Sequence, residues 1–344
     1  MSTAGSTAMS EERAHGVPGP AKADRPPGLR HQVMANGGVA SIFIFFLAVC
    51  ILFGLVTDSF LTEANILNIL RQSAPLLIVA TAMTFVITTG GIDLSVGSML
   101  GLVGALSAVL LQAGVPWPAA LVGLVLLGAL IGAVQGFFIA YEGIPAFIVT
   151  LAGLGIIRGV ALLITQGYSI PVDPGSAFVI IGRGWVAGLP LPAIIAVAVL
   201  ALGILIFTQT RFGRYVTGIG ANAEAVRRAG VNIRRVTMLV YVLSGAAAAL
   251  AAVVIAARLG SGSANAGAGF ELDVIAAVVL GGTSLFGGRG TMIGTVLGAL
   301  TVAVIGNGLI LAHMSPFLTP IITGVIILIA IWLNFRIFRT TTRR

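Results

Sequence analysis

From Gln209 to Arg235 the chain reads QTRFGRYVTGIGANAEAVRRAGVNIRR, the only long polar interruption in a very apolar sequence. One acid, Glu224, stands in this stretch against six arginines: Arg211, Arg214, Arg227, Arg228, Arg234 and Arg235. A cluster of arginines between apolar segments is typical of a cytoplasmic loop in a membrane protein. The stretch is therefore expected to be a cytoplasmic loop between membrane-spanning segments.

The arginine loop contains the signals of one short helix. Asn222 suits the N-cap, where its side chain accepts from unpaired backbone N–H groups. Glu224 follows in the first turn, and Arg227 and Arg228 lie in the last turn, which matches the helix dipole. Gly230 suits the position after the helix, where a positive φ is needed. We predict a helix between Asn222 and Gly230.

This helix would present a face of small apolar residues. Ala223, Val226 and Ala229 recur every three residues and would fit a groove on another protein. The alternative is a loop that only fixes the orientation of the chain in the membrane. Such a loop needs no capped helix and no small-residue face, so we favour a binding role.

Composition indicates an all-α polytopic membrane protein. Of the 344 residues 58% are hydrophobic and 9% charged, whereas about a quarter are charged in a soluble domain. The apolar runs suit helices better than the roughly ten-residue segments of a barrel. The net charge of +8 resides in loops and tails beside the apolar runs, so we expect the lipid bilayer and no nucleic acid as a partner.

About ten transmembrane helices are expected, since a span takes about 20 apolar residues. Their ranges are 39–56, 75–89, 94–111, 119–141, 145–165, 191–208, 236–258, 272–285, 291–312 and 317–335. Residues 57–73 would lie at the interface. We expect a disordered cytoplasmic tail at 1–36, a transmembrane domain at 37–336 that includes the loop at 209–235, and a basic cytoplasmic tail at 337–344.

The basic residues support both termini in the cytoplasm. With an even number of spans and both tails inside, fifteen of the nineteen Lys and Arg residues lie on the cytoplasmic side. The exceptions are Arg71, Arg158, Arg183 and Arg258. This distribution follows the positive-inside rule.

Two spans share a faint repeat. GALIGAVQG at 128–136 aligns with GALTVAVIG at 298–306, with identity at six of nine positions. A chance match is the alternative, because Gly, Ala, Leu and Val dominate every span. The two segments run in opposite directions in this topology, so we favour inverted duplicated halves, a transporter architecture.

The segment TTGGIDLSVG at 88–97 is the first candidate for gating or translocation. Gly91 and Gly97, with Gly90, permit a break between two helices. Such a break at membrane depth must be buried in protein or line a cavity. An acid near the membrane, here Asp93, is a functional candidate. It could also cap the next helix with Ser95 in the first turn, and we favour capping.

The segment GFELDVIAAVVLGGTSLFGGRG at 269–290 is the second candidate. Glu271 and Asp273 would lie at a helix N-terminus, where the dipole favours acids, or could meet an outside partner or a cation. Gly281 and Gly282 belong to the glycine cluster that closes the segment. Two acids are too few for a metal cage. Faces of small residues for close helix packing are expected at Gly97, Gly101 and Gly104 and at Gly128, Gly132 and Gly136.

No enzyme is indicated. The sequence has no GxxxxGK[ST] motif, so we expect no nucleotide hydrolysis through a P-loop. The three histidines are scattered and form no zinc signature. No pairing of a nucleophile with a base stands out, and we expect neither catalytic residues nor a cofactor.

Three motifs in order resemble the permease subunits of bacterial ABC importers for monosaccharides such as ribose, xylose and galactose. They are GGIDLSVGS at 90–98, FGRYVTGIGANAEAVRRAGVNI at 212–233 and GFELDVIAAVVLGGTSLFGGRGTMIGTVLGA at 269–299. The resemblance covers about 60–333. It implies the importer permease fold in the bacterial inner membrane, with a permease homodimer.

The resemblance also implies partners. They are a cytoplasmic ATPase with two nucleotide-binding cassettes in one chain, which uses the ATP, and a periplasmic or tethered sugar-binding protein. Residues 212–233 would be the coupling segment, with Gly220 and the helix at Asn222–Gly230 against the ATPase. Residues 90–97 and 281–290 are candidate moving parts.

A secondary transporter driven by an ion gradient is the alternative function. It would also have inverted halves and broken helices. It needs acids in the membrane as ion sites, and only Asp93, or less plausibly Glu142, could serve. It leaves the capped helix of the arginine loop unexplained.

Overall fold

The computed structural model describes residues 29–315, 317–318, 321–325 and 328–329. Over these residues the protein consists of helices joined by loops that contain four two-residue strands. The helices are α1 (Leu29–Val56), α2 (Glu63–Thr88), α3 (Val96–Gln112), α4 (Trp117–Ala140), α5 (Ala146–Thr165), η1 (Ala177–Val179), α6 (Ile180–Arg183), α7 (Leu191–Gln209), α8 (Arg211–Arg228), α9 (Ile233–Leu259), α10 (Phe270–Leu280) and α11 (Met292–Leu311). Strand β1 (Ile170–Pro171) pairs antiparallel with β4 (Ser261–Gly262), and β2 (Trp185–Val186) with β3 (Leu189–Pro190).

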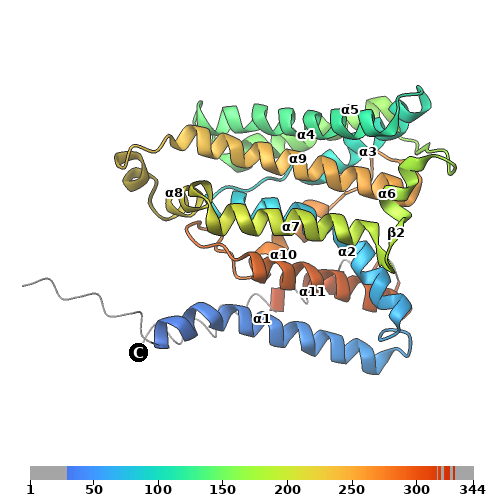
Figure 1. The fold of residues 1–344 in the computed structure, drawn as a ribbon, viewed down its shortest axis with the longest axis horizontal. Helices are drawn as coiled ribbons and strands as arrows, with labels where there is room; N and C mark the ends of the chain where they lie inside the picture. Colours follow the sequence, from blue (N-terminus) through green and yellow to red (C-terminus); the bar gives the residue numbers. More distant parts are fainter. Residues whose placement is uncertain (1–28, 316, 319–320, 326–327, 330–344) are drawn as a thin grey trace, which may run out of the picture. The chain divides into compact units, whose positions relative to one another are not determined.

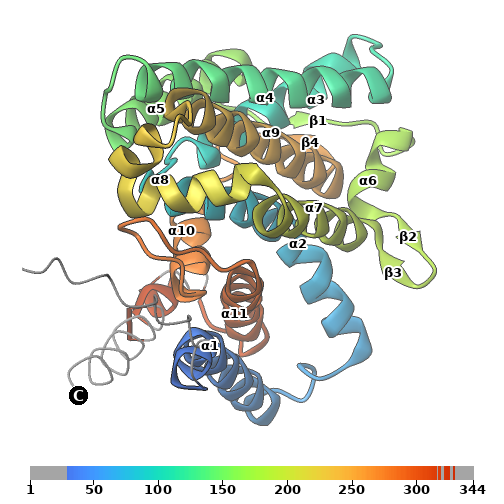
Figure 2. The same ribbon diagram turned by 60° about the vertical axis from the view of Figure 1, so that its left-hand side comes forward.

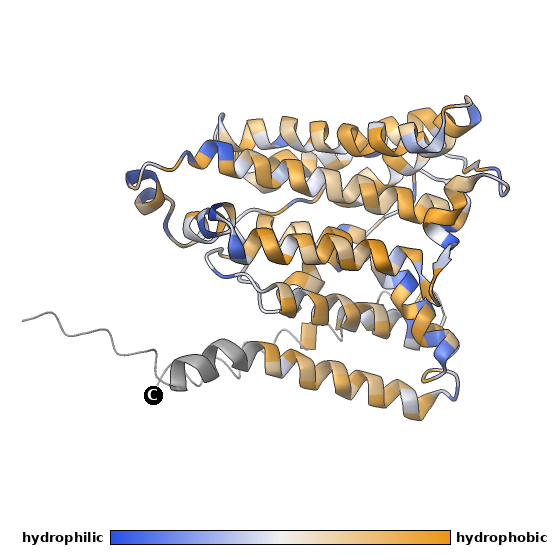
Figure 3. Ribbon diagram, in the orientation of Figure 1, coloured by the Kyte–Doolittle hydropathy of each residue, from blue (hydrophilic) through white to orange (hydrophobic). Residues whose placement is uncertain are grey.

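Seven helices of the described part are long and apolar enough to cross a membrane: α1 from Val39 onward, α2, α4, α5, α7, α9 and α11. Figure 3 shows their apolar middles and more polar ends. Many of their large apolar side chains point away from protein, such as Leu126 and Leu163, which suits contact with lipid. The expected all-α membrane class is confirmed. The helix α3 is shorter, and α10, with 11 residues, is too short to span alone.

Several predicted segments lie outside the described residues. These are residues 1–28 of the predicted N-terminal tail, most of the predicted span at 317–335, and the basic tail at 337–344. The helix α1 begins at Leu29, so residues 29–36, which the sequence predicted as part of the tail, are helical.

The predicted boundary between an interfacial segment and a second span is wrong. Residues 63–88 form one continuous helix, α2, with Pro75 inside it. Thr62 caps this helix by accepting from the N–H of Asn65 at 3.4 Å. Proline removes one backbone donor, but neighbouring helices make such an interruption tolerable in a membrane bundle. Asn65 also exchanges two hydrogen bonds of 3.0 Å with Asn307, which joins the start of α2 to α11.

Glycines allow α4 to pack directly on α9. A Cβ added at Gly128, Gly132 or Gly136 would overlap the backbone of α9 at Gly245, Tyr241 or Met238. The predicted close packing through this glycine face is confirmed. The helix α9 also packs on α2 and α3, and it lies beside α4 in both Figure 1 and Figure 2.

The chain between α9 and α11 is largely irregular. Residues 260–269 run along α3, α10 follows, and residues 281–291 lead into α11. Figure 2 shows α10 beside α11, where a Cβ at Gly281 would overlap the backbone of Gly294. The glycine face of α3 does not serve helix packing as predicted at Gly97 and Gly101. Both meet the irregular backbone of 264–267 instead, together with the side chain of Glu271 at Gly97 and that of Arg158 at Gly101.

Candidate functional site

The arginine loop is more helical than the sequence suggested. The helix α8 runs from Arg211 to Arg228, but Asn222, at φ −162° and ψ 92°, divides it into two helices at a kink. Thr210 caps the first helix by accepting from the N–H of Gly213 at 3.3 Å. Val216 and Ile219 on this helix are buried. The first half of the loop is thus anchored to the bundle.

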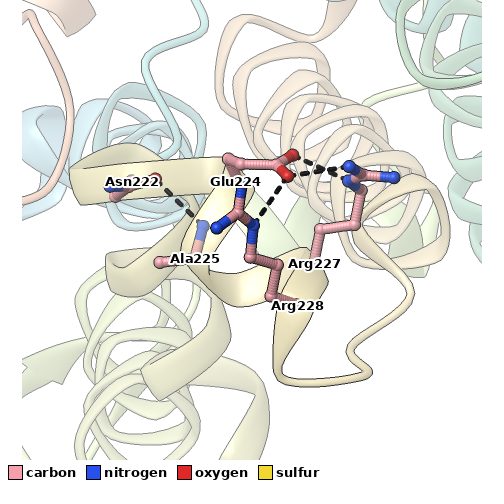
Figure 4. A network of polar contacts seen from close by, with 5 residues as sticks. All are labelled: Asn222, Glu224, Ala225, Arg227 and Arg228. Atoms are coloured by element: carbon pink, nitrogen blue, oxygen red, sulfur yellow. Dashed lines mark hydrogen bonds and ion pairs between the residues drawn. The ribbon is translucent and has the colours of Figure 1, made fainter.

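The second helix of α8 is the short helix that the sequence predicted. Asn222 Oδ1 accepts from the N–H of Ala225 at 3.0 Å, so the N-cap is confirmed, and Gly230 has φ +80°. Figure 4 shows Glu224 held by two guanidinium groups. Arg227 donates twice at 2.7 Å and Arg228 once at 3.0 Å. These hydrogen bonds lower the pKa of Glu224 to about 2.

The predicted apolar face of this helix is only partly available. Ala223 and Ala229 are exposed, but Val226 is half-buried. Val226 packs toward the protein core, and a Cβ at Gly218 would come within 2.9 Å of its side chain. The kink at Asn222 turns the second helix so that this face points partly inward. The exposed surface is formed instead by the two alanines and the Glu224 ion cluster.

The three candidate segments meet at Gly220. The N–H of Gly288 donates to the carbonyl of Thr88 at 2.9 Å. A Cβ added at Gly220 would overlap this carbonyl oxygen and the amide nitrogen of Gly288. Gly287, at φ +81°, lies against Gly220 and the amide of Gly90. The end of α2, the first helix of α8 and the 281–290 loop therefore form one junction, in which Gly220 has no room for a side chain.

Gly281 and Gly282 shape the start of that loop. Gly281 follows the last residue of α10 and crosses Gly294 of α11. Gly282 has φ +89°, a conformation that strains other residues. The N–H of Ser284 donates to the carbonyl of Arg289 at 2.9 Å and closes the loop.

Asp93 is buried in a network of hydroxyl and amide groups. Its Oδ1 accepts from the N–H of Ser95 at 3.0 Å and from the hydroxyl of Ser95 at 2.7 Å. Its Oδ2 accepts from the hydroxyl of Ser244 on α9 at 2.7 Å, and Gln135 of α4 bonds to Ser95. The N-cap residue of α3 is Ser95 rather than Asp93. The predicted cap is corrected: Asp93 accepts from the residue at the N-cap position and also ties α3 to α9.

Sequence reasoning missed Gln135, Ser244 and Tyr241 in this region. The hydroxyl of Tyr241 is buried with no hydrogen-bond partner among the described residues, and a Cβ at Gly91 would overlap it. A search for polar side chains inside apolar spans would have found all three, because such residues are costly in a membrane.

Glu271 and Asp273 lie in the first turn of α10, as predicted. The Oε2 atom of Glu271 is buried without a hydrogen-bond partner in the described part of the chain, and it covers Gly97 of α3. Arg158 of α5 lies within electrostatic range of Glu271 and donates to the carbonyls of Ala264 and Ala266. The described residues hold no group of three or more His, Cys, Asp or Glu side chains that could bind a metal ion.

The chain matches known proteins over most of its length. Residues 65–331 match the family described as branched-chain amino acid transport system / permease component. The ribose import permease protein of Escherichia coli K12 is 41% identical over 281 residues, which are 80% of this chain and 87% of that protein. Its counterpart from Haemophilus influenzae is 38% identical over 292 residues, 84% of this chain and 90% of that protein.

A third relative is the xylose transport system permease protein of Escherichia coli K12, 33% identical over 350 aligned positions, 84% of this chain and 89% of that protein. No solved structure matches the chain. The family match and these relatives confirm the resemblance that the three motifs indicated. The chain belongs to this family of transport-system permease components, whose members include the ribose and xylose permeases.

Proposed function

We propose that this chain is the membrane subunit of an ATP-driven importer for a monosaccharide, a ribose-like pentose or a hexose. The observation that carries the proposal is the 41% identity to a ribose import permease over 87% of that protein's length. The described part of the chain has seven helices long and apolar enough to cross a membrane, as suits the membrane subunit of an importer.

The partner at the arginine loop is a cytoplasmic ATPase with two nucleotide-binding cassettes in one chain. The exposed helix after Asn222 supports this role, because its cap and the Glu224 cluster fix its shape before any partner binds. A preordered element loses less conformational entropy on binding. Within the coupling segment at 212–233, the residues assigned to coupling are Gly220, Asn222, Glu224, Arg227, Arg228 and Gly230. A second permease copy and a periplasmic or tethered sugar-binding protein complete the importer.

The topology has ten spans in the bacterial inner membrane, with both termini cytoplasmic. Beyond the seven candidate spans, the shorter helix α3 is the eighth, and α10 together with the irregular backbone beside it is the ninth. The tenth is the span predicted at 317–335, which lies largely outside the described residues. The helices α3 and α10 are the broken elements, and both begin after irregular backbone that is partly buried against protein, a setting in which such backbone is tolerated. The halves related by the repeat at 128–136 and 298–306 are inverted. The membrane domain is 37–336, between tails at 1–36 and 337–344.

Transport follows from movement at the junction of these elements. Closure of the ATPase shifts the helix at Ala223–Ala229, and the bundle changes from inward to outward access. The candidate gating residues are Gly91, Asp93, Ser95 and Gly97 in the first break and Glu271, Asp273, Gly281 and Gly282 in the second. Specificity resides mainly in the binding protein, so the permease alone binds sugar weakly.

Co-purification from mild detergent tests this proposal. The tagged chain should retain a two-cassette ATPase and a sugar-binding protein, and uptake in vesicles should require ATP. An ion-driven transporter predicts the reverse: the chain purifies alone, and uptake survives loss of ATP but stops with an uncoupler. Micromolar binding of ribose by the purified permease alone would contradict the proposal that the permease itself binds sugar only weakly.

A further inference from the structure

One continuous segment, residues 260–290, touches both the coupling segment and the opposite end of the bundle. We call it the 260–290 excursion. It leaves α9 after Leu259, passes along α3, forms α10, and reaches the junction at Gly220 before α11 begins. Its two ends make close backbone contacts with different helices, so each end can be followed separately.

The first part of the excursion lies in a groove that glycines form on α3. Gly262 meets the carbonyl of Gly104, and Gly267 meets the carbonyl of Gly97, each so closely that a Cβ would overlap it. A Cβ at Gly101 would come within 2.5 Å of the carbonyl oxygen of Ala264. Because these backbone contacts leave no free space, a shift of residues 261–267 relative to α3 must be a discrete step rather than a gradual deformation.

Arg158 of α5 forms hydrogen bonds with the first part of the excursion. Its Nη1 donates to the carbonyls of Ala264 and Ala266, which have no helix or strand partner of their own at these positions. A charged donor makes hydrogen bonds about twice as strong as a neutral one. The guanidinium forms no salt bridge in the described part of the chain. Its main polar contacts are therefore the hydrogen bonds to Ala264 and Ala266.

The last part of the excursion contacts the coupling segment. A Cβ added at Gly288 would come within 2.9 Å of Ala221 Cα, and one at Gly287 within 3.0 Å of Gly220 Cα. The N–H of Gly288 also bonds to Thr88 at 2.9 Å. Between the two parts lies the helix α10 of 11 residues, which packs on α2 and α11 and connects the two ends of the excursion.

We propose that the 260–290 excursion carries movement of the coupling segment to the far end of the bundle. The contact of Gly220 with Gly288 is its input, and the hydrogen bonds of Arg158 set how easily residues 261–267 release from α3. The source of the movement in the cell rests on the proposed function. The mechanical link is a property of the permease alone.

Hydrogen–deuterium exchange of the purified chain in nanodiscs tests the link without any partner or substrate. Gly220→Ala forces Thr88 and Gly288 to move apart. We expect faster exchange at 287–290 and also at 260–269, by at least about threefold, because coupled elements share local opening. Gly306→Ala is the matched control, since a Cβ there meets nothing within 4 Å, and it should leave both segments unchanged.

A second variant approaches from the other end. Arg158→Gln removes the charged hold on Ala264 and Ala266, and coupling is reciprocal, so exchange should rise at 260–269 and at 287–290. The proposal would be overturned if, in either variant, amide exchange changed only in the segment next to the substitution, which is 287–290 for Gly220→Ala and 260–269 for Arg158→Gln. Should Gly220→Ala fail to fold, Arg158→Gln decides alone. If the link holds but the chain retains no ATPase, the proposed function fails while this inference stands.

Discussion

Glu224 accepts a two-point hydrogen bond from Arg227, with Nε and Nη2 each 2.7 Å from a different carboxylate oxygen. Arg228 adds a third donor at 3.0 Å. All three side chains are exposed at the end of α8 that the proposed topology places in the cytoplasm. One acid thus orders two arginines on the surface that we assign to the ATPase.

The titration of Glu224 is the first prediction. Its pKa is lowered to about 2 by hydrogen bonds from Arg227 and Arg228. A lowered pKa in the folded protein means that the contribution of the ion cluster to stability is complete above the ordinary value of 4.5 and is lost as pH falls toward 2. The infrared difference between the wild type and Glu224→Gln should show carboxylate protonation near pH 2. A midpoint near 4.5 would mean that the cluster does not persist in solution.

Loss of the cap at Asn222 is the second prediction. Asn222→Ala leaves the N–H of Ala225 without its 3.0 Å acceptor and should cost the short helix about 1 kcal/mol. Amide exchange at 223–229 should rise about fivefold, and ATP-driven uptake should fall while membrane insertion is unchanged. Asn222→Ser keeps an acceptor and is the control. Equal losses in both variants would assign the effect to something other than capping.

Coupling itself is the third prediction. Glu224→Arg combined with Gly230→Pro removes the ion cluster and replaces a residue at φ +80°, which proline cannot adopt. The permease should insert and retain the ATPase, but ATP hydrolysis should no longer drive uptake. The two rates are measured together in vesicles that contain the whole importer. Normal uptake by this variant would exclude a coupling role for the short helix.

The apolar runs and caps of the sequence predicted most of the helices. The ends of the short helix at Asn222 and Gly230 were predictable because capping depends on neighbouring residues alone. Pro75 misled the prediction of α2, because its tolerance depends on helices that are distant in sequence. The inward orientation of Val226 could not be predicted from the sequence either, since it follows from the kink at Asn222 and from contact with Gly218.

The candidate site was predictable as separate motifs but not as a junction. Each of Thr88, Gly220 and Gly288 lies in a motif that the sequence identified. That these residues meet is a tertiary fact, since nothing local requires Gly220 to lack a side chain. The same holds for the glycines of α3, where spacing indicated close packing but not that the partner would be irregular backbone.

The Asp93 network gives the fourth prediction. Asp93→Ala removes the acceptor of the Ser244 and Ser95 hydroxyls, both buried, and should lower stability in detergent by about 1–3 kcal/mol. Asp93→Asn keeps one acceptor oxygen and should lose less, with ATP-driven uptake retained. Thermal unfolding and uptake are measured on both variants. Loss of uptake in a folded Asp93→Asn protein would instead favour an ion-coupled role for the carboxylate.

Helix α4 offers a matched pair for the last prediction. A Cβ at Gly132 would overlap the carbonyl of Tyr241 and lie 3.2 Å from Val242 Cα, whereas one at Gly123 meets nothing within 4 Å. Gly132→Ala should therefore force α4 away from α9 and destabilise the protein by about 1–3 kcal/mol. Gly123→Ala should be neutral or slightly stabilising, because alanine favours a helix by up to about 1 kcal/mol. Thermal unfolding in one detergent compares the two, and equal melting temperatures would mean that α4 and α9 do not pack backbone to backbone in the membrane.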